Sequence, residues 1–360
     1  MPDQLAPELK ALRDRAAEFA ASLHATRERP EVVAAAREAG FFQMTQPRRY
    51  GGTAAGPLAL TVVREELAAA NPPFLDAVFG PGPGVLAGCA EPLASDYLQP
   101  MLRGAKRPAF GFTEPESNPT TGRLEGDDLV VNGCKSYVTG GADADFINTL
   151  VRIEERGPAM VVIDARAPGV QMTERFESLD GSHHAAFEFS DLRVPANRIV
   201  GKPGEGLPRA MGQISDTRLA IGAYSVGLAR WVVERTTKHL AKTDRHGKPL
   251  GDREGVRLRY ADMRTGAFAA RSMLYRTARL AESGANAINE TIMCKVFATE
   301  AITAIVDTAI QLHGGQALVV GHPLETLYRR VRAWRLAEGA SDVLRLNLAR
   351  GALDLGKGTL

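Results

Sequence analysis

Residues 311–354 read QLHGGQALVVGHPLETLYRRVRAWRLAEGASDVLRLNLARGALD. The pair Gly314–Gly315 interrupts a helical pattern, so a turn is expected there. A last helix is expected from about Ser341 to Leu353, with Ser341 as its N-cap, because a serine oxygen can accept bonds from the free amides of a first helical turn. Glu338 lies just before that helix. The stretch therefore predicts the end of a helical domain that carries a carboxylate beside a helix start.

The chain upstream of this stretch keeps the helical pattern back to about residue 207. Apolar side chains recur there three and four residues apart, and one such stripe consists of Val256, Tyr260, Met263, Ala267, Ala270 and Leu274. This spacing places apolar residues on one face of a helix, which must then bury that face. Four long helices joined by short glycine-bearing connections predict a four-helix bundle over residues 207–360.

The pattern changes in the middle of the chain. Between residues 106 and 206, short runs such as DLVVNG and AMVVIDA alternate with Gly, Pro, Asn and Asp. Strands about ten residues apart with turn signals between them predict an antiparallel sandwich or small barrel. Residues 1–105 are again helical in pattern. The predicted fold class is α+β, mostly α, with an N-terminal helical domain (1–105), a middle antiparallel β domain (106–206) and a C-terminal four-helix bundle (207–360).

The composition limits the classes of function. The chain has 360 residues, 44% apolar and 24% charged, and its formal net charge is +2. These values are typical of a soluble globular protein and offer no basic surplus for nucleic acid. No apolar run reaches the roughly 18 residues of a membrane span, and the N-terminus does not resemble a signal peptide. The cysteines, Cys89, Cys134 and Cys294, are too far apart for a zinc motif and suggest reduced, buried thiols. We expect a cytoplasmic protein.

Several short motifs fail on their context. GPGPGVLAG (80–88) has no strand-turn-helix unit around it, and GALDLGKG (351–358) has no Ser/Thr and no following helix, so neither predicts a nucleotide site. His183 and His184 are adjacent in a strand-like run, where successive side chains face opposite ways and cannot reach one metal ion. No HExxH or GxSxG motif is present. We therefore expect no metal site and none of the common hydrolase chemistries.

The whole chain resembles the acyl-CoA dehydrogenase family. The 311–354 stretch matches the family's Q-x-x-G-G turn, its PVERLYRDARI-like run and its E-G-T segment. Five other segments match in the family's order: REAGFFQMTQPRRYGG, FGFTEP, LEGDDLVVNGCKSYVTGGADAD, FSDLRVPANRIVG and KPLGDREGVRLRYADM. The resemblance implies α,β-desaturation of an acyl thioester, with FAD between the β domain and the bundle. It also implies electron-transfer flavoprotein or a similar acceptor as partner, and a dimeric or tetrameric assembly.

The resemblance also implies a catalytic base. Glu338, in LAEGAS, matches the glutamate that removes the α-proton in most of the family, and Arg218, in SDTRLAIGA, matches an arginine near the base and the substrate. An α-proton beside a thioester is weakly acidic, so a carboxylate that removes it works best in a dry site that raises its pKa. A carboxylate placed to favour a helix N-terminus is the structural alternative for Glu338. An exposed arginine on a helix is the alternative for Arg218.

The implied flavin contacts come from three segments. Residues in FGFTEP match family positions that hold the isoalloxazine edge. Residues in KSYVTG match an aromatic that stacks near the ring and a threonine near N5. Residues in QLHGG match a turn that approaches a neighbouring subunit's FAD. The residues are Phe112, Thr113, Tyr137, Thr139, Gln311, Gly314 and Gly315. Tyrosine replaces the usual tryptophan at position 137 but still offers a flat face. Ordinary strand packing and a helix C-cap are the structural alternatives.

Three glycine pairs occupy predicted turns. These are Gly51–Gly52, Gly140–Gly141 and Gly314–Gly315, and the resemblance brings only the last pair to the cofactor. Gly315→Val is therefore expected to weaken flavin retention more than Gly52→Val.

The sequence departs from the family at cofactor and thioester contacts. TEPESNPTTG contains an extra Pro119, which changes the thioester-binding segment. Thr243 replaces an arginine that meets the FAD pyrophosphate, His246 replaces a phenylalanine, and a shifted Arg245 is available to compensate. Ala340 and Asp342 replace two further cofactor contacts in the EGASD segment.

These departures leave two alternatives beside an FAD-dependent acyl-CoA or acyl-carrier dehydrogenase. One is a subunit of a hetero-oligomeric dehydrogenase that donates few FAD contacts. The other is a flavin monooxygenase or oxidase of the same fold.

Overall fold

The computed structural model describes residues 4–25, 28–243 and 247–356. The helices are α1 (Pro7–Ser22), α2 (Arg29–Glu38), α3 (Pro57–Ala70), α4 (Gln99–Arg103), α5 (Gly206–Leu240), α6 (Glu254–Glu282), α7 (Ile288–His313), α8 (Pro323–Trp334) and α9 (Ser341–Leu353). The strands are β1 (Pro108–Gly111), β2 (Thr121–Glu125), β3 (Asp128–Thr139), β4 (Phe146–Ile153), β5 (Gly157–Asp164), β6 (Val170–Glu177), β7 (His183–Pro195) and β8 (Ile199–Val200). The order of helical, β and helical regions predicted from the sequence is confirmed.

The chain divides into two compact units. One contains residues 1–42, 55–79 and 215–360, and the other contains residues 43–54 and 80–214. The division falls within α5 and joins most of the N-terminal helices to the C-terminal ones. The bounds 1–105, 106–206 and 207–360 were set along the sequence rather than from contacts, and they stay a prediction.

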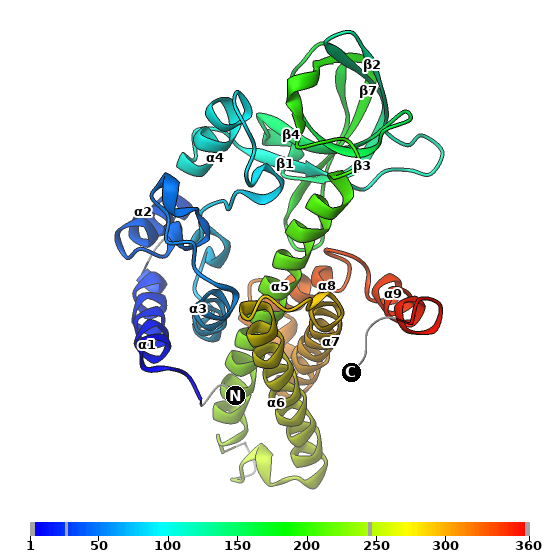
Figure 1. The fold of residues 1–360 in the computed structure, drawn as a ribbon. Coiled ribbons are helices and arrows are strands. Elements are labelled where there is room, and N and C mark those ends of the chain that lie inside the picture. The colour runs from blue at the N-terminus through cyan, green and yellow to red at the C-terminus, as the bar shows by residue number, and fades with distance from the viewer. Residues whose placement is uncertain (1–3, 26–27, 244–246, 357–360) are drawn as a thin grey trace. The chain divides into compact units, whose positions relative to one another are not determined.

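The β unit contains a single strongly curved sheet (Figure 1). Its strand order is β6-β7-β3-β2-β4-β5-β8, with β1 beside β4. Most pairs are antiparallel, as predicted, but β1 and β2 both run parallel to β4. The strands alternate buried and exposed residues, so one sheet face forms a core around Phe187 and Phe189. In a second core, the helical segment that precedes β1, which includes Tyr97, packs against other residues of the sheet.

The helical unit buries the faces that the apolar spacing predicted. Leu219 of α5, Leu274 of α6 and Cys294 of α7 meet in one core, and Val296 of α7 packs with Leu344 of α9 in another. Helix α8 was not predicted. Pro323 occupies its first turn, where the fixed φ of proline suits a helix. His322 caps the helix, because its Nδ1 accepts a hydrogen bond from the Leu324 amide at 3.2 Å. In the described residues no helix is both long and apolar enough to cross a membrane.

The N-cap prediction at Ser341 is wrong. Helix α9 begins at Ser341 and ends at Leu353 as predicted, but Ala340 is the N-cap and has no side chain that could cap. The Ser341 amide and hydroxyl donate backwards instead, to the Arg335 carbonyl at 2.9 and 3.3 Å. Ser341 therefore ties α9 to the preceding turn, because the carbonyls at the end of α8 have no partner within the helix and can accept from outside it.

The cysteine prediction holds in part. Cys89, Cys134 and Cys294 are free thiols, but only Cys89 and Cys294 are buried, while Cys134 is half-buried. Burial raises the pKa of Cys294 to about 12, so this thiol is unreactive at neutral pH.

Candidate active site

Glu338 lies in a strained turn between α8 and α9. Its φ is +54°, and the φ of the following Gly339 is +103°. Only glycine adopts such angles freely, and a left-handed residue with a side chain costs on the order of 1 kcal/mol. The turn can persist only if surrounding contacts hold it.

Two buried cations hold this turn by its backbone. Arg218 of α5 is 5% exposed, and its Nε donates to the Glu338 carbonyl at 2.9 Å. Lys295 of α7 is fully buried, and its Nζ donates to the Gly339 carbonyl at 2.9 Å and the Arg335 carbonyl at 3.3 Å. Lys295 thus fixes the carbonyls at the start and end of the turn, and Arg218 fixes the Glu338 carbonyl between them.

The same groups set the charge of Glu338. Its side chain is half-buried, and this burial raises the pKa of the carboxyl, although Arg218 and Lys295 act in the opposite direction. Burial and the nearby Arg218 lower the pKa of Lys295 to about 8, although Glu338 and Glu300 oppose that change. Partial desolvation raises the proton affinity of the carboxylate, and the two nearby cations limit that increase.

Arg218 and Glu338, singled out from the sequence, are therefore neighbours, and Arg218 is not an exposed helix residue. Lys295 was missed. The signal was present, because Lys295 lies at helical spacing from Ile292, Thr299 and Ile302, which are buried. A lysine on a buried helix face requires an acceptor that only the folded structure identifies.

The candidate flavin contacts of the β unit lie close together. Phe112 and Thr113 follow β1, and Tyr137 and Thr139 belong to β3. The Ser136 amide donates to the Thr113 carbonyl at 3.0 Å, which joins the two segments. Thr113, Tyr137 and Thr139 are exposed, with Tyr137 at 45%, whereas Phe112 is half-buried against Phe110. An exposed aromatic face beside two hydroxyls fits the edge of a flat, polar ring system.

Tyr137 rests on an unpredicted polar cluster. Its hydroxyl lies 2.5 Å from Ser178 Oγ, and its ring lies 4.2 Å from the His184 ring. His184 Nε2 is 2.9 Å from Ser182 Oγ, which donates to Asp180 at 2.6 Å. His183 is exposed and His184 is buried, so the predicted opposite orientation of the two is confirmed. Burial lowers the pKa of His184, which keeps this imidazole neutral beneath Tyr137.

Gln311 lies in the last turn of α7, and Gly314 and Gly315 form an open turn directly after the helix. All three are exposed, and Gly314, with φ +75°, is the C-cap of the helix. A Cβ added at Gly314 or Gly315 would meet nothing within 4 Å. The turn therefore leaves room for close approach by a group from outside its unit, as the predicted contact with a neighbouring subunit's FAD requires.

The departures from the family pattern are accommodated locally. Glu114 holds the TEPESNPTTG segment, because its carboxylate accepts from the Thr120 amide at 3.1 Å and pairs with the fully buried Lys135. Pro119 packs so tightly that a Cβ on Gly133 would lie 2.4 Å from its carbonyl oxygen. Asp342, which could repel a diphosphate, is paired with Arg345 at 2.9 Å.

The remaining departures lie near α5's end. Thr243 forms an isolated bridge with Pro249. Arg245 and His246 lie outside the described residues.

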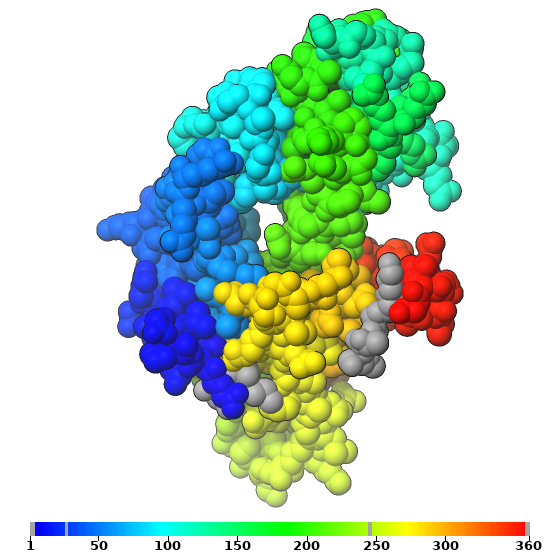
Figure 2. Space-filling model, in the orientation of Figure 1, coloured from blue at the N-terminus to red at the C-terminus, as the bar shows by residue number. Residues whose placement is uncertain are grey.

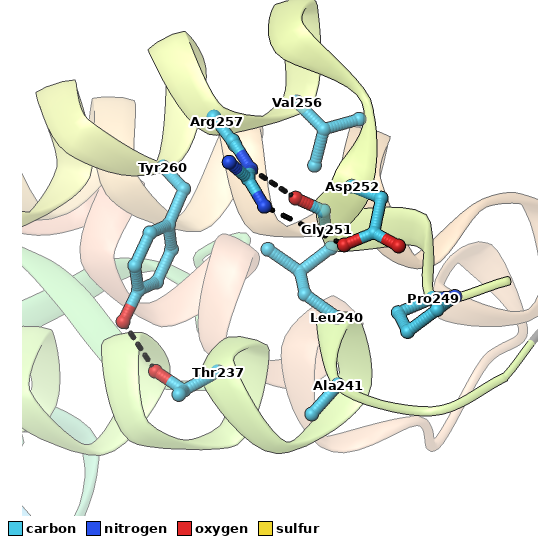
Figure 3. Close-up of a pocket in the computed structure, with 9 residues that line it drawn as sticks. All are labelled: Thr237, Leu240, Ala241, Pro249, Gly251, Asp252, Val256, Arg257 and Tyr260. Atoms are coloured by element: carbon cyan, nitrogen blue, oxygen red, sulfur yellow. Dashed lines mark hydrogen bonds and ion pairs between the residues drawn. The ribbon is translucent and has the colours of Figure 1, made fainter.

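A pocket of about 440 Å³ lies between the end of α5 and the start of α6 (Figure 3). The hydroxyls of Tyr260 and Thr237 form a hydrogen bond across it, and Arg257 Nε donates to the Gly251 carbonyl at 2.7 Å. Its lining residues include none of the predicted site residues. In the described part of the chain, no group of three or more His, Cys, Asp or Glu side chains could hold a metal ion.

Comparison with known proteins identifies the family. Residues 6–105, 109–192 and 204–353 match the N-terminal, middle and C-terminal domains of acyl-CoA dehydrogenases. The cyclohexane-1-carbonyl-CoA dehydrogenase of Geobacter metallireducens is 28% identical, over 96% of this chain and 95% of its own. The caffeyl-CoA reductase-Etf complex subunit CarC of Acetobacterium woodii is 27% identical, over 87% of each chain.

A solved structure agrees with these matches. A probable acyl CoA dehydrogenase from Mycobacterium abscessus has a TM-score of 0.84 and 26% identity, over 96% of this chain and 98% of that one. The chain therefore belongs to the acyl-CoA dehydrogenase family, as its sequence predicted. It is an FAD-dependent oxidoreductase acting on CH–CH bonds.

Proposed function

We propose that this protein catalyses α,β-desaturation of an acyl thioester, with Glu338 removing the α-proton. The observation that carries the proposal is the turn of Glu338, whose carboxylate is half-buried and whose backbone is held by two buried cations, Arg218 at the Glu338 carbonyl and Lys295 at the Gly339 carbonyl. A carboxylate that served only to favour the start of α9 would need neither burial nor two cations.

The chemistry requires a base that is both strong and ionised. Burial raises the proton affinity of Glu338, which favours transfer of a weakly acidic α-proton to it. Arg218 and Lys295 act against this change, because positive charges favour the ionised form, which is the form that accepts the proton. The side chain can therefore accept the proton and hold it as a neutral acid in a partly desolvated site.

FAD, when bound, supplies the acceptor for the β-hydride. Tyr137 offers it a flat face, Thr113 and Thr139 offer hydroxyls, and Phe112 supports this edge. Gln311 and Gly314–Gly315 would contact the FAD of a neighbouring subunit.

That contact requires an oligomer. Figure 2 shows the C-terminal helix, coloured red, at the surface, and Leu346 and Leu353 on it are 70% and 83% exposed. Val320, near the Gly314–Gly315 turn, is 78% exposed. In the proposed oligomer, another subunit would cover such exposed apolar side chains. Electron-transfer flavoprotein or a similar protein would reoxidise the flavin, and we expect the enzyme in the cytoplasm.

An absorbance spectrum tests the proposed reaction. The protein purified alone is expected to show flavin bands that bleach when an acyl-CoA of suitable chain length is added without oxygen. A colourless protein that becomes yellow only with a second chain would favour a hetero-oligomeric subunit instead. Consumption of oxygen by the reduced flavin, without bleaching by any acyl-CoA of a chain-length series, would favour a monooxygenase.

Gly315→Val is expected to weaken FAD binding by on the order of tenfold, or about 1.4 kcal/mol, because the added side chain fills the open approach at this turn. Equilibrium dialysis of FAD against the variant measures the effect. Gly52→Val is not a suitable comparison, since a Cβ there would lie 2.0 Å from the Gln46 carbonyl oxygen. Gly212→Val is the matched control, because its Cβ also meets nothing within 4 Å. Equal FAD affinity in the two variants would place the cofactor away from Gly315.

A further inference from the structure

Lys295 is fully buried, yet its ammonium forms no ion pair with any carboxylate that the structure describes. It donates hydrogen bonds to two carbonyl oxygens, those of Arg335 and Gly339. Burying an ammonium without a counter-charge in contact is costly, and neutral carbonyls compensate only in part. A methionine or leucine would pack in this core without that cost, so the charge requires another explanation.

We propose that Lys295 is the positioning residue of the base: its ammonium holds the two ends of the 335–339 turn that carries Glu338 and, while protonated, acts on the Glu338 carboxylate as a positive charge. The bonds to residues 335 and 339 enclose Glu338, and Arg218 holds the carbonyl of Glu338 itself from α5. This inference rests on the proposed function of Glu338 as a base.

The charge has a role separate from the hydrogen bonds. A nearby positive charge stabilises the ionised form of a carboxyl, so Lys295 keeps the pKa of Glu338 below the value that burial alone would give. The other charged groups around it are already engaged. Glu300 of α7 pairs with Arg335 at 2.9 Å and with Arg345 of α9 at 3.5 Å. Arg218 provides the other cation near Glu338.

Two substitutions separate these roles. Lys295→Met keeps the length of the side chain but removes both charge and donor, whereas Lys295→Gln removes the charge and keeps an N–H donor. Thr299→Val is the matched control, because Thr299 is equally buried one helical turn further on and its hydroxyl donates only within α7. All variants are prepared as the full chain loaded with FAD.

The first readout is the titration of Glu338 itself. The infrared band of its protonated carboxyl, identified by its absence in Glu338→Gln, is followed against pH. In both Lys295 variants the midpoint is expected to rise by about 1 pH unit relative to the wild type, and in Thr299→Val it is expected to stay unchanged. This measurement needs no turnover.

The second readout is exchange of the α-hydrogen of an acyl-CoA with deuterated water. The acid limb of its pH profile is expected to move upward by the same amount in both variants. Above that limb Lys295→Gln should recover most of the wild-type rate, because its donor still holds the turn, whereas Lys295→Met should stay at least tenfold slower.

The inference is overturned if both variants titrate Glu338 as the wild type does, even if their unfolding temperature falls, because Lys295 would then be only structural. If Lys295→Met does not fold, Lys295→Gln decides the titration. Absence of α-hydrogen exchange in the wild type would instead contradict the proposed function. A raised midpoint in the infrared titration would still support the role of Lys295 toward Glu338.

Discussion

Glu338→Gln is expected to slow bleaching of the flavin by a suitable acyl-CoA by about 10²–10⁴-fold, the usual contribution of a positioned general base. Glutamine matches glutamate in size but cannot accept the α-proton. The substitution keeps the turn, because Arg218 and Lys295 bond to backbone carbonyls rather than to the side chain. FAD is expected to stay bound, so the loss belongs to the proton-transfer step. Stopped-flow absorbance without oxygen measures it directly.

The pH dependence follows from the same group. Glu338 acts in its ionised form, so the wild-type rate should fall as the pH drops through its pKa, and burial places that limb above the range of an ordinary glutamate. Glu254→Gln, which removes an exposed carboxylate from the same unit, is the control and should retain the wild-type rate. A Glu338→Gln protein that bleaches at the wild-type rate would place the base elsewhere.

The fold and the position of Glu338 could be predicted because their signals are local. The helical spacing in α6 and the turn signals around the strands depend only on residues close together in the sequence. The bounds of α9 were predicted as observed. Ser341 shows the limit of this reasoning. A serine at a helix start usually caps the helix, but here the carbonyl of Arg335 is the available acceptor.

The hydrogen bonds that hold the site could not be predicted, because they join residues far apart in the sequence. Lys295 meets Gly339, 44 residues later, and Arg218 meets Glu338, 120 residues later. The His184 ring beneath Tyr137 depends in the same way on how β3 and β7 pair. Periodicity indicates that Lys295 lies on a buried face, but it cannot say which carbonyl the ammonium reaches.

Stability of the helical unit depends on a second buried charge, Glu65 of α3. The carboxylate is 1% exposed and accepts from Arg271 Nε at 2.6 Å, Arg230 Nη1 at 2.9 Å and the Tyr275 hydroxyl at 2.5 Å. These partners come from α5 and α6, so one side chain joins three helices. Helix α5 approaches so closely that a Cβ on Gly227 would lie 2.2 Å from the Glu65 carbonyl oxygen.

Glu65→Ala is expected to lower the free energy of unfolding by about 3 kcal/mol, the lower end of the range for removing one partner of a buried ion pair. The lower end applies because the arginine side chains are each 32% exposed and can regain water, and because Arg230 keeps Glu66 as a partner at 2.9 Å. Arg271 and the buried Tyr275 lose their carboxylate.

Urea unfolding of the FAD-loaded protein, followed by circular dichroism, measures the change in midpoint. Glu234→Ala removes an exposed pair with Lys238 and should shift the midpoint little. If Glu65→Ala shifted it no further than Glu234→Ala does, the three-helix junction would contribute no more than a surface pair.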